Sequence, residues 1–267
     1  MIIWRKVGVG DIVIKSNDLP PAPKVRYTTS RGGEWHESDP IIDDNGVFSG
    51  FDGKETAVEV VLPENAGIEE IGEYVFQEHE NLVSVVLPSG VTSIGEEAFG
   101  NCFNLENISL PDTLTSIGGG AFDICSALTS IEIPNGVTNI EWYAFADCEA
   151  LSRISIPNGV TSIEEGVFTG CSALTSVRIP DSVTSIGDYA FLYCESLERV
   201  TIPDGVTDIG QEAFSYCTEL KNITIPANVS AIGTSAFAYC KSMRSFSVGA
   251  ENDNYKSVDG LLLTKDG

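Results

Sequence analysis

The sequence predicts a solenoid, a β-rich stack of about eight coils with short helical or 3-10 turns and a cap at each end. Three observations support this fold class. A 23-residue unit recurs seven times without interruption from Leu82 to Ser242. A looser copy, Ala57–Asn81, precedes these units and carries two extra residues. The same residue types return at the same places of the units, as expected when each unit is one coil of a stack.

The repeated unit has the pattern L-x-x-[IV]-x-[ILV]-P-x-x-[VL]-x-x-I-[GE]-x-x-[AV]-F-x-x-C-x-x. Its apolar columns are expected to point inward, because stacked coils bury a continuous core. The phenylalanine column consists of Phe76, Phe99, Phe122, Phe145, Phe168, Phe191, Phe214 and Phe237. The proline column consists of Pro63, Pro88, Pro111, Pro134, Pro157, Pro180, Pro203 and Pro226.

The first segment of each coil is predicted to be a strand. In residues 128–134, Leu128, Ile131 and Ile133 are apolar, and the last two alternate with polar neighbours. Such alternation is typical of a strand with one buried side. Pro134 has no backbone donor and a fixed φ, so the strand is expected to end there.

Two further segments complete the coil. Residues 136–140 place Val137 and Ile140 inward on a second extended or turn segment. Ala144, Phe145 and Cys148 then follow at spacings of one and three, which favours a short helical turn over a strand.

All seven cysteines fall in one column: Cys102, Cys125, Cys148, Cys171, Cys194, Cys217 and Cys240. Stacked coils would place successive Cα atoms ~4.8 Å apart, within reach of a disulfide. Equivalent side chains in a stack point in parallel, however, and the number of cysteines is odd. No C-x-x-C pair suits a metal. We therefore predict reduced thiols in the core, no metal site and no cofactor. The looser coil has His79 in this column.

The sequence divides into four parts. Residues 1–23 predict an extended N-terminal arm that ends in a Pro-rich linker. Residues 24–56 are expected to form an N-terminal cap, and residues 57–242 the solenoid. Residues 243–267 are expected to form a ninth strand and a C-terminal cap. Caps are expected because the end coils would otherwise expose core and strand edges. Two interpretations of the arm stay open: a disordered leader, or an attachment segment to a larger assembly.

The charge balance excludes some partners. The net charge is −24, and residues 55–152 contain seventeen Asp and Glu but no Lys or Arg. Nucleic acid requires a basic surface, and the chain has no apolar run of the length that would insert into a bilayer. No signal peptide is visible at the amino terminus. The acidic block is either a solvated surface or one suited to a cationic partner, to cation-rich surroundings or to the prevention of self-association.

The stretch IPNGVTSIEEGVFTGCSAL, residues 156–174, resembles the BspA-like leucine-rich repeat family, and the likeness extends over residues 57–242. Residues 25–37 resemble the segment that often precedes such arrays. Residues 248–267 resemble the segment that often closes one, but stop where that segment normally continues, so a truncated carboxyl terminus is expected.

The resemblance implies a non-enzymatic binding or adhesion module that recognises protein or glycan ligands at a bacterial cell surface or outside the cell. An alternative is a structural or receptor-binding component of a phage particle, virion-associated and attached through residues 1–23. The family supplies no catalytic residues. The two histidines, His36 and His79, form no recognisable catalytic or metal motif.

Binding residues are therefore sought among the outward positions. Three arginines, Arg153, Arg178 and Arg199, interrupt a small and neutral strand face on consecutive coils. They would form a compact cationic spot that holds a carboxylate, a sulfate or an acidic loop. Alternatively, Arg178 pairs with a carboxylate such as Glu132, or all three are solvated.

Aromatic residues provide a second candidate surface. Tyr193, Tyr216 and Tyr239 each precede a cysteine, and Trp142, Tyr143 and Tyr189 occupy nearby variable positions. Stacked tyrosines either cover their neighbours or form an interface or glycan-stacking strip. Type and register alone leave both interpretations open.

Overall fold

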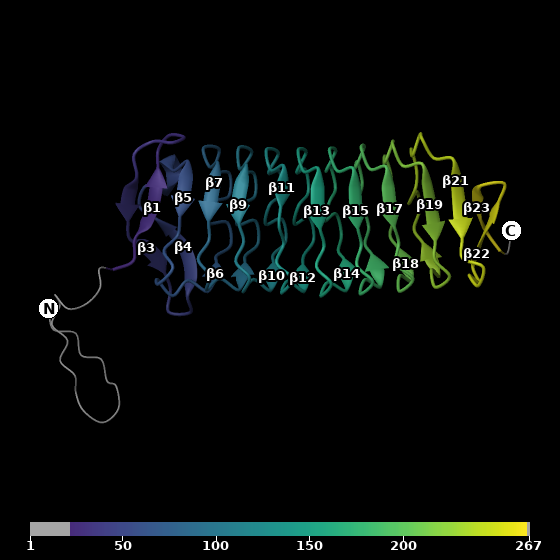
Figure 1. The fold of residues 1–267 in the computed structure, drawn as a ribbon, viewed down its shortest axis with the longest axis horizontal. Helices are drawn as coiled ribbons and strands as arrows, with labels where there is room; N and C mark the ends of the chain where they lie inside the picture. Colours follow the sequence, from purple (N-terminus) through teal and green to yellow (C-terminus); the bar gives the residue numbers. More distant parts are fainter. Residues whose placement is uncertain (1–21, 266–267) are drawn as a thin grey trace, which may run out of the picture.

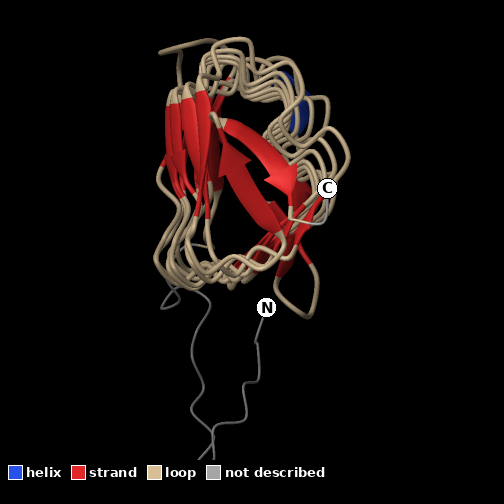
Figure 2. Ribbon diagram, turned by 90° about the vertical axis from the view of Figure 1, so that its right-hand side faces the viewer, coloured by secondary structure: helices blue, strands red, loops and turns tan. Residues whose placement is uncertain are grey.

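The computed structural model describes residues 22–265, and these form one continuous stack of coils (Figure 1). The fold class predicted from the sequence is confirmed. Seen along the stack, the strands gather on separate sides of the tube and turns form the remainder (Figure 2). Most of the predicted arm, residues 1–21, lies outside the described residues, so the two interpretations of that arm stay predictions.

The first side of the stack is made of parallel strands. Equivalent residues pair across a separation of 23, as in Ile154 with Val177. The ladder is interrupted between β9 and β11 and between β17 and β19. The strands are β5 (Glu59–Val61), β7 (Ser84–Val86), β9 (Asn107–Ser109), β11 (Ser130–Ile131), β13 (Arg153–Ser155), β15 (Ser176–Arg178), β17 (Arg199–Thr201), β19 (Asn222–Ile225) and β21 (Ser245–Val248). The last of these, β21, follows the eight coils and pairs with β19.

The second side is made of two-residue parallel strands with an interruption between β12 and β14, and each strand ends in an isoleucine that is buried in all but the last, Ile232. Their shortness follows from the sharp bends on either side of the buried residue. They are β6 (Glu70–Ile71), β8 (Ser93–Ile94), β10 (Ser116–Ile117), β12 (Asn139–Ile140), β14 (Ser162–Ile163), β16 (Ser185–Ile186), β18 (Asp208–Ile209) and β20 (Ala231–Ile232).

The third side, which carries the phenylalanine and cysteine columns, differs from the expectation of a helical turn. Among residues 22–265 the single helix is η2 (Lys54–Thr56), which precedes the coils. We count positions from the leucine that opens each coil, so phenylalanine is position 18 and cysteine position 21. The N–H groups of positions 16, 18 and 20 donate to carbonyls of the next coil, as in Phe99 to Ala121 at 2.9 Å. In a helix these N–H groups would donate to carbonyls of the same coil. On the third side, which we call the turn side, they donate to the next coil and so join the coils.

Left-handed backbone makes these hydrogen bonds between coils possible. Position 16 has a φ of 46° to 62° and position 20 a φ of 50° to 71° in all eight coils. Position 16 is occupied by Tyr74, Glu97, Gly120, Tyr143, Gly166, Tyr189, Glu212 and Ser235. Position 20 is occupied by Glu78, Asn101, Ile124, Asp147, Gly170, Tyr193, Tyr216 and Tyr239.

The core is a set of identical columns. The eight column phenylalanines stack with successive ring centroids 5.2 to 5.9 Å apart and interplanar angles of at most 20°. The seven cysteines are free, and all but Cys240 are fully buried. Each Sγ–H donates to the carbonyl oxygen of the phenylalanine of the preceding coil at 3.0 to 3.3 Å. The predicted thiol column in the core is therefore confirmed.

Both ends of the phenylalanine column are covered. At the N-terminal end, Phe48 of β4 (Val47–Phe51) stacks on Phe76 at 6.2 Å, and β4 extends the second-side ladder. Strands β1 (Val25–Thr28), β2 (His36–Ser38) and β3 (Pro40–Ile42) complete this end. At the other end Phe246 packs edge-on against Phe237 at 5.3 Å. A hairpin of β22 (Tyr255–Val258) and β23 (Leu261–Thr264) follows.

We predict that Phe145→Ala lowers the free energy of unfolding by about 3–5 kcal/mol, because it removes a fully buried ring and leaves a cavity between two others. The measurement is urea unfolding followed by circular dichroism. The matched control is Phe103→Ala, whose ring is 41% exposed; this change is expected to cost less than about 0.5 kcal/mol. Equal losses for the two variants would contradict the column.

Candidate functional site

The three arginines lie on neighbouring strands of the first side. Arg153 and Arg199 occupy one row, with Ser176 of the intervening strand between them, and Arg178 lies one row further along. All three side chains are exposed. Among residues 22–265 none of them forms an ion pair, so the pairing of Arg178 with Glu132 that the sequence allowed does not occur. Because no carboxylate of the described residues pairs with them, these guanidinium groups can bind an anionic group. We call this set the arginine spot.

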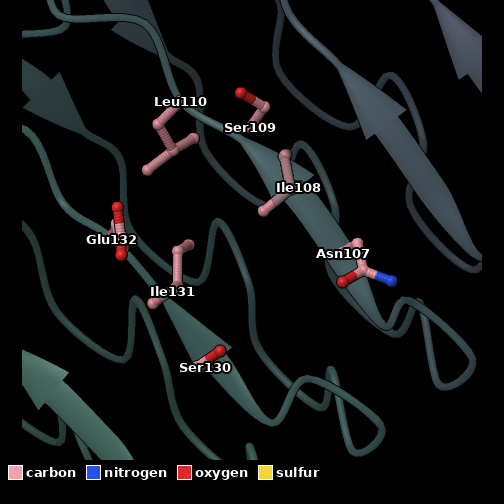
Figure 3. Close-up of a pocket in the computed structure, with 7 residues that line it drawn as sticks. All are labelled: Asn107, Ile108, Ser109, Leu110, Ser130, Ile131 and Glu132. Carbon is pink, nitrogen blue, oxygen red and sulfur yellow. The ribbon is translucent and has the colours of Figure 1, made fainter.

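Shallow grooves lead to the arginine spot. One of about 350 Å³ lies between β11 and β13, and its lining consists of Ser130, Ile131, Glu132, Arg153, Ile154 and Ser155. The next, of about 300 Å³, lies where the strand ladder is interrupted between β9 and β11. Figure 3 shows its lining residues on these two strands and, with Leu110 and Glu132, just beyond their ends. They combine the apolar Ile108, Leu110 and Ile131 with the polar Asn107, Ser109, Ser130 and Glu132. The first side therefore offers polar contacts next to the cationic groups.

The candidate aromatic residues lie on the turn side. Tyr143 and Tyr189 occupy position 16, and Tyr193, Tyr216 and Tyr239 occupy position 20, so all five have left-handed backbone. Trp142 lies at position 15, next to Tyr143. The structure thus separates the predicted site residues into two groups, arginines on the first side and aromatics on the turn side.

Trp142 and Tyr143 pack over glycines of the neighbouring coils. A Cβ atom placed on Gly119 would come within 2.4 Å of the Trp142 ring, and one on Gly166 within 2.4 Å of the Tyr143 ring. The Tyr143 hydroxyl also donates to Glu165 Oε1 at 3.0 Å. These two rings therefore cover glycines of the neighbouring coils.

Tyr193, Tyr216 and Tyr239 are different, because they pack on one another. Their ring centroids are 4.6 and 4.4 Å apart, and the interplanar angles are 34° and 22°. Tyr193 is 44% and Tyr239 61% exposed. We call these three residues the tyrosine ladder. Tyr189 stands apart and accepts a hydrogen bond from Gln211 Nε2 at 2.7 Å.

Carboxylates dominate the electrostatics of the turn side. A hydrogen bond to Glu96 is the main cause that raises the pKa of Tyr74 to about 12, and burial with the Glu165 contact raises that of Tyr143 to about 12. Burial and the charges of Asp147 and Glu97 raise the pKa of Asp123 to about 6. A side with this charge distribution attracts cations and repels anions.

The sequence interpretation missed a slot beside the tyrosine ladder. It has a volume of about 350 Å³ and is lined by Asp147, Glu149, Gly170, Ser172, Tyr193 and Glu195. Aligning position 20 along the coils shows the signal that was available, since glycine replaces a side chain between Asp147 and Tyr193. That single small residue opens the slot.

Residues 22–265 contain no group of three or more His, Cys, Asp or Glu side chains placed to hold a metal ion. In the same range, no helix is both long and apolar enough to cross a bilayer. His79 is buried in the cysteine column, where Nε2 contacts the carbonyl oxygen of Lys54 and Nδ1 has no partner.

A family model described as the BspA type leucine rich repeat region matches residues 49–171 and 138–257, with six copies of the repeat. A search of curated proteins gives no significant match. Together the two matched ranges run from within β4, through all the coils, to within β22.

Three solved structures share the fold. A leucine-rich repeat protein from Bacteroides ovatus aligns with a TM-score of 0.67 and 27% identity over 93% of this chain and 69% of that one. The T. pallidum leucine rich repeat protein gives 0.62 and 32% over 68% and 86%. A leucine rich cell surface protein from Faecalibacterium prausnitzii gives 0.60 and 31% over 85% of this chain but 56% of that one.

The left-handed positions lead to a stability prediction. Ser235 has a φ of 58° and an exposed side chain. We expect Ser235→Gly to raise the free energy of unfolding by about 0.5–1 kcal/mol, because glycine adopts left-handed backbone without the steric cost of a Cβ atom. Urea unfolding measures the change. The reverse substitution, Gly166→Ala, is expected to destabilise, since its Cβ would also meet the Tyr143 ring. Destabilisation by Ser235→Gly would contradict the assigned backbone.

Proposed function

Because the chain belongs to the BspA-type leucine-rich repeat family, we propose that it is a non-enzymatic binding module that recognises a protein or glycan ligand at a bacterial cell surface. A binding or adhesion role in general is what this family indicates. The surface location is supported by one structural relative that is described as a cell surface protein. Repetition of the coil leaves recognition to the outward side chains, which vary while the core columns stay fixed.

The observation that carries the proposal is the arginine spot. Three exposed guanidinium groups on adjacent strands, none of them paired within residues 22–265, stand on a chain whose net charge is −24. Arginine binds carboxylate and sulfate groups through planar bidentate hydrogen bonds. The neighbouring serines and the two grooves add hydrogen-bonding groups for the rest of a ligand. The spot therefore fits a ligand that bears carboxylate or sulfate groups.

A catalytic role receives no support from the described residues. Six of the seven thiols are buried in the core and Cys240 is partly buried, and burial raises their pKa values, so they are poor nucleophiles. The two grooves beside β11 are shallow and lined by apolar side chains, serine hydroxyl groups, Asn107, one arginine and one carboxylate. Such surfaces suit recognition.

We predict that changing Arg153, Arg178 and Arg199 together to Ser weakens binding to carboxylated or sulfated ligands by at least about tenfold, since each charge-assisted contact is worth ~1.5–3 kcal/mol. The measurement is a glycan and host-protein array probed with the purified chain, followed by titration of the bound ligands. The melting temperature should fall by no more than a few degrees, because exposed side chains carry little stability.

The control is Arg244→Ser, an exposed arginine that lies outside the arginine spot. This variant is expected to keep the affinity of the unmodified chain. If the triple variant also keeps it, the arginine spot is not the binding site.

A further inference from the structure

The tyrosines of the coils occupy backbone that disfavours them. All six tyrosines in residues 57–242 have a φ between 52° and 59°, at position 16 or 20. Left-handed backbone costs a residue with a Cβ roughly 1–2 kcal/mol relative to right-handed backbone. Gly120, Gly166 and Gly170 show that glycine fits the same positions. The fold therefore does not require rings there, and their presence calls for another cause.

For the tyrosine ladder, contact with the core is not that cause. The column phenylalanines fill the interior, whereas Tyr193 and Tyr239 expose 44% and 61% of their surface. The three rings lie on one another at 4.4 to 4.6 Å and so present a continuous aromatic strip along three coils. Exposed aromatic strips of this kind are typical of recognition surfaces.

The slot next to Tyr193 determines the charge of the partner. Gly170 lines the slot, and a Cβ atom placed on it would come within 1.9 Å of Asp147 Oδ1. A side chain at residue 170 would displace the Asp147 carboxylate, so the position of Asp147 depends on this glycine. Glu149 and Glu195 complete the lining on either side of Ser172. The result is an opening with an aromatic ring on one wall and three carboxylates around it.

The carboxylates of the slot have no counter-charge. Within residues 22–265 none of the three forms an ion pair, and none accepts a side-chain hydrogen bond from a neighbour. Partial burial and the adjacent charge of Glu149 raise the pKa of Asp147. The backbone below is fixed by bonds to the next coil, such as Asp147 N–H to Thr169 at 2.7 Å and Gly170 N–H to Leu192 at 2.7 Å. The slot is thus preorganised for a cation.

We propose that the tyrosine ladder and its slot bind an arginine- or lysine-bearing segment of a protein partner. A guanidinium or ammonium group over the face of an aromatic ring gains from the ring quadrupole, and the carboxylates add charge-assisted hydrogen bonds. Charge complementarity favours this occupant over a neutral sugar, which would leave the three carboxylates without a counter-charge. The inference concerns the turn side and does not depend on the arginine spot.

The test measures binding of a fluorescent peptide that alternates arginine with glycine, by anisotropy, against the same peptide with citrulline in place of arginine. We expect the arginine peptide to bind and added salt to weaken it, because exposed charges are screened. The citrulline peptide should bind at least about tenfold more weakly. Equal binding of both peptides, or no binding of either, would overturn the proposal.

Two variants locate the site. The first variant replaces all three rings of the tyrosine ladder by combining Tyr193→Gly, Tyr216→Gly and Tyr239→Gly. It should weaken arginine-peptide binding by about threefold per ring. Glycine suits the left-handed backbone, so the fold is expected to survive. The second variant neutralises the carboxylates of the slot by combining Asp147→Asn, Glu149→Gln and Glu195→Gln. These substitutions keep the shapes of the side chains and should weaken binding of the arginine peptide by about tenfold.

The matched control is Tyr74→Gly, which removes a tyrosine from left-handed backbone on a coil outside the ladder and slot. Tyr74→Gly should leave peptide binding unchanged. The triple arginine variant should also leave it unchanged, so a wrong assignment of the slot can be distinguished from a wrong assignment of the arginine spot. Unchanged binding in both the ring and the carboxylate variants would overturn the assignment, as would an equal loss in Tyr74→Gly.

Discussion

Hydrogen bonding of each coil to the next, with equivalent strand residues paired 23 positions apart, is the constraint on which this structure depends. On two sides the strands pair in this register, and on the turn side three N–H groups per coil donate to the next coil. Each inward side chain consequently lies over its own equivalent. Phenylalanine tolerates this because flat rings stack, and cysteine because its thiol donates to the carbonyl oxygen of the preceding phenylalanine. A buried charge would be placed over a like charge, which is why the inward columns are apolar.

The same register organises the outer surface. A residue type that recurs on consecutive coils becomes a row spaced by one coil, so a few substitutions create a patch. Arg153, Arg178 and Arg199 form a cationic spot in this way, and Tyr193, Tyr216 and Tyr239 form an aromatic ladder. A gap in a column has the opposite effect. Gly170 interrupts position 20 and opens a slot between the coils on either side.

The strands and core columns could be predicted from the sequence because they repeat with a period and bury apolar residues. The turn side could not. Left-handed backbone is normally indicated by glycine or asparagine, but here tyrosine, glutamate and even Ile124 adopt it, since the inter-coil hydrogen bonds outweigh the local preference. The spacing of Phe145 and Cys148 therefore suggested a helical turn. The side on which each candidate residue lies followed from its column, whereas the slot required the backbone around Gly170.

Thiol labelling of the native protein tests the stacked columns most directly. Burial raises the pKa of Cys102 to about 12 and that of the half-buried Cys240 to about 11, so little thiolate forms at about pH 8. The account predicts that the six buried cysteines resist a thiol reagent, that Cys240 reacts slowly, and that all seven react at once when the chain is unfolded in guanidinium. Rapid labelling of a cysteine in the middle of the stack, such as Cys148, in the native protein would contradict it.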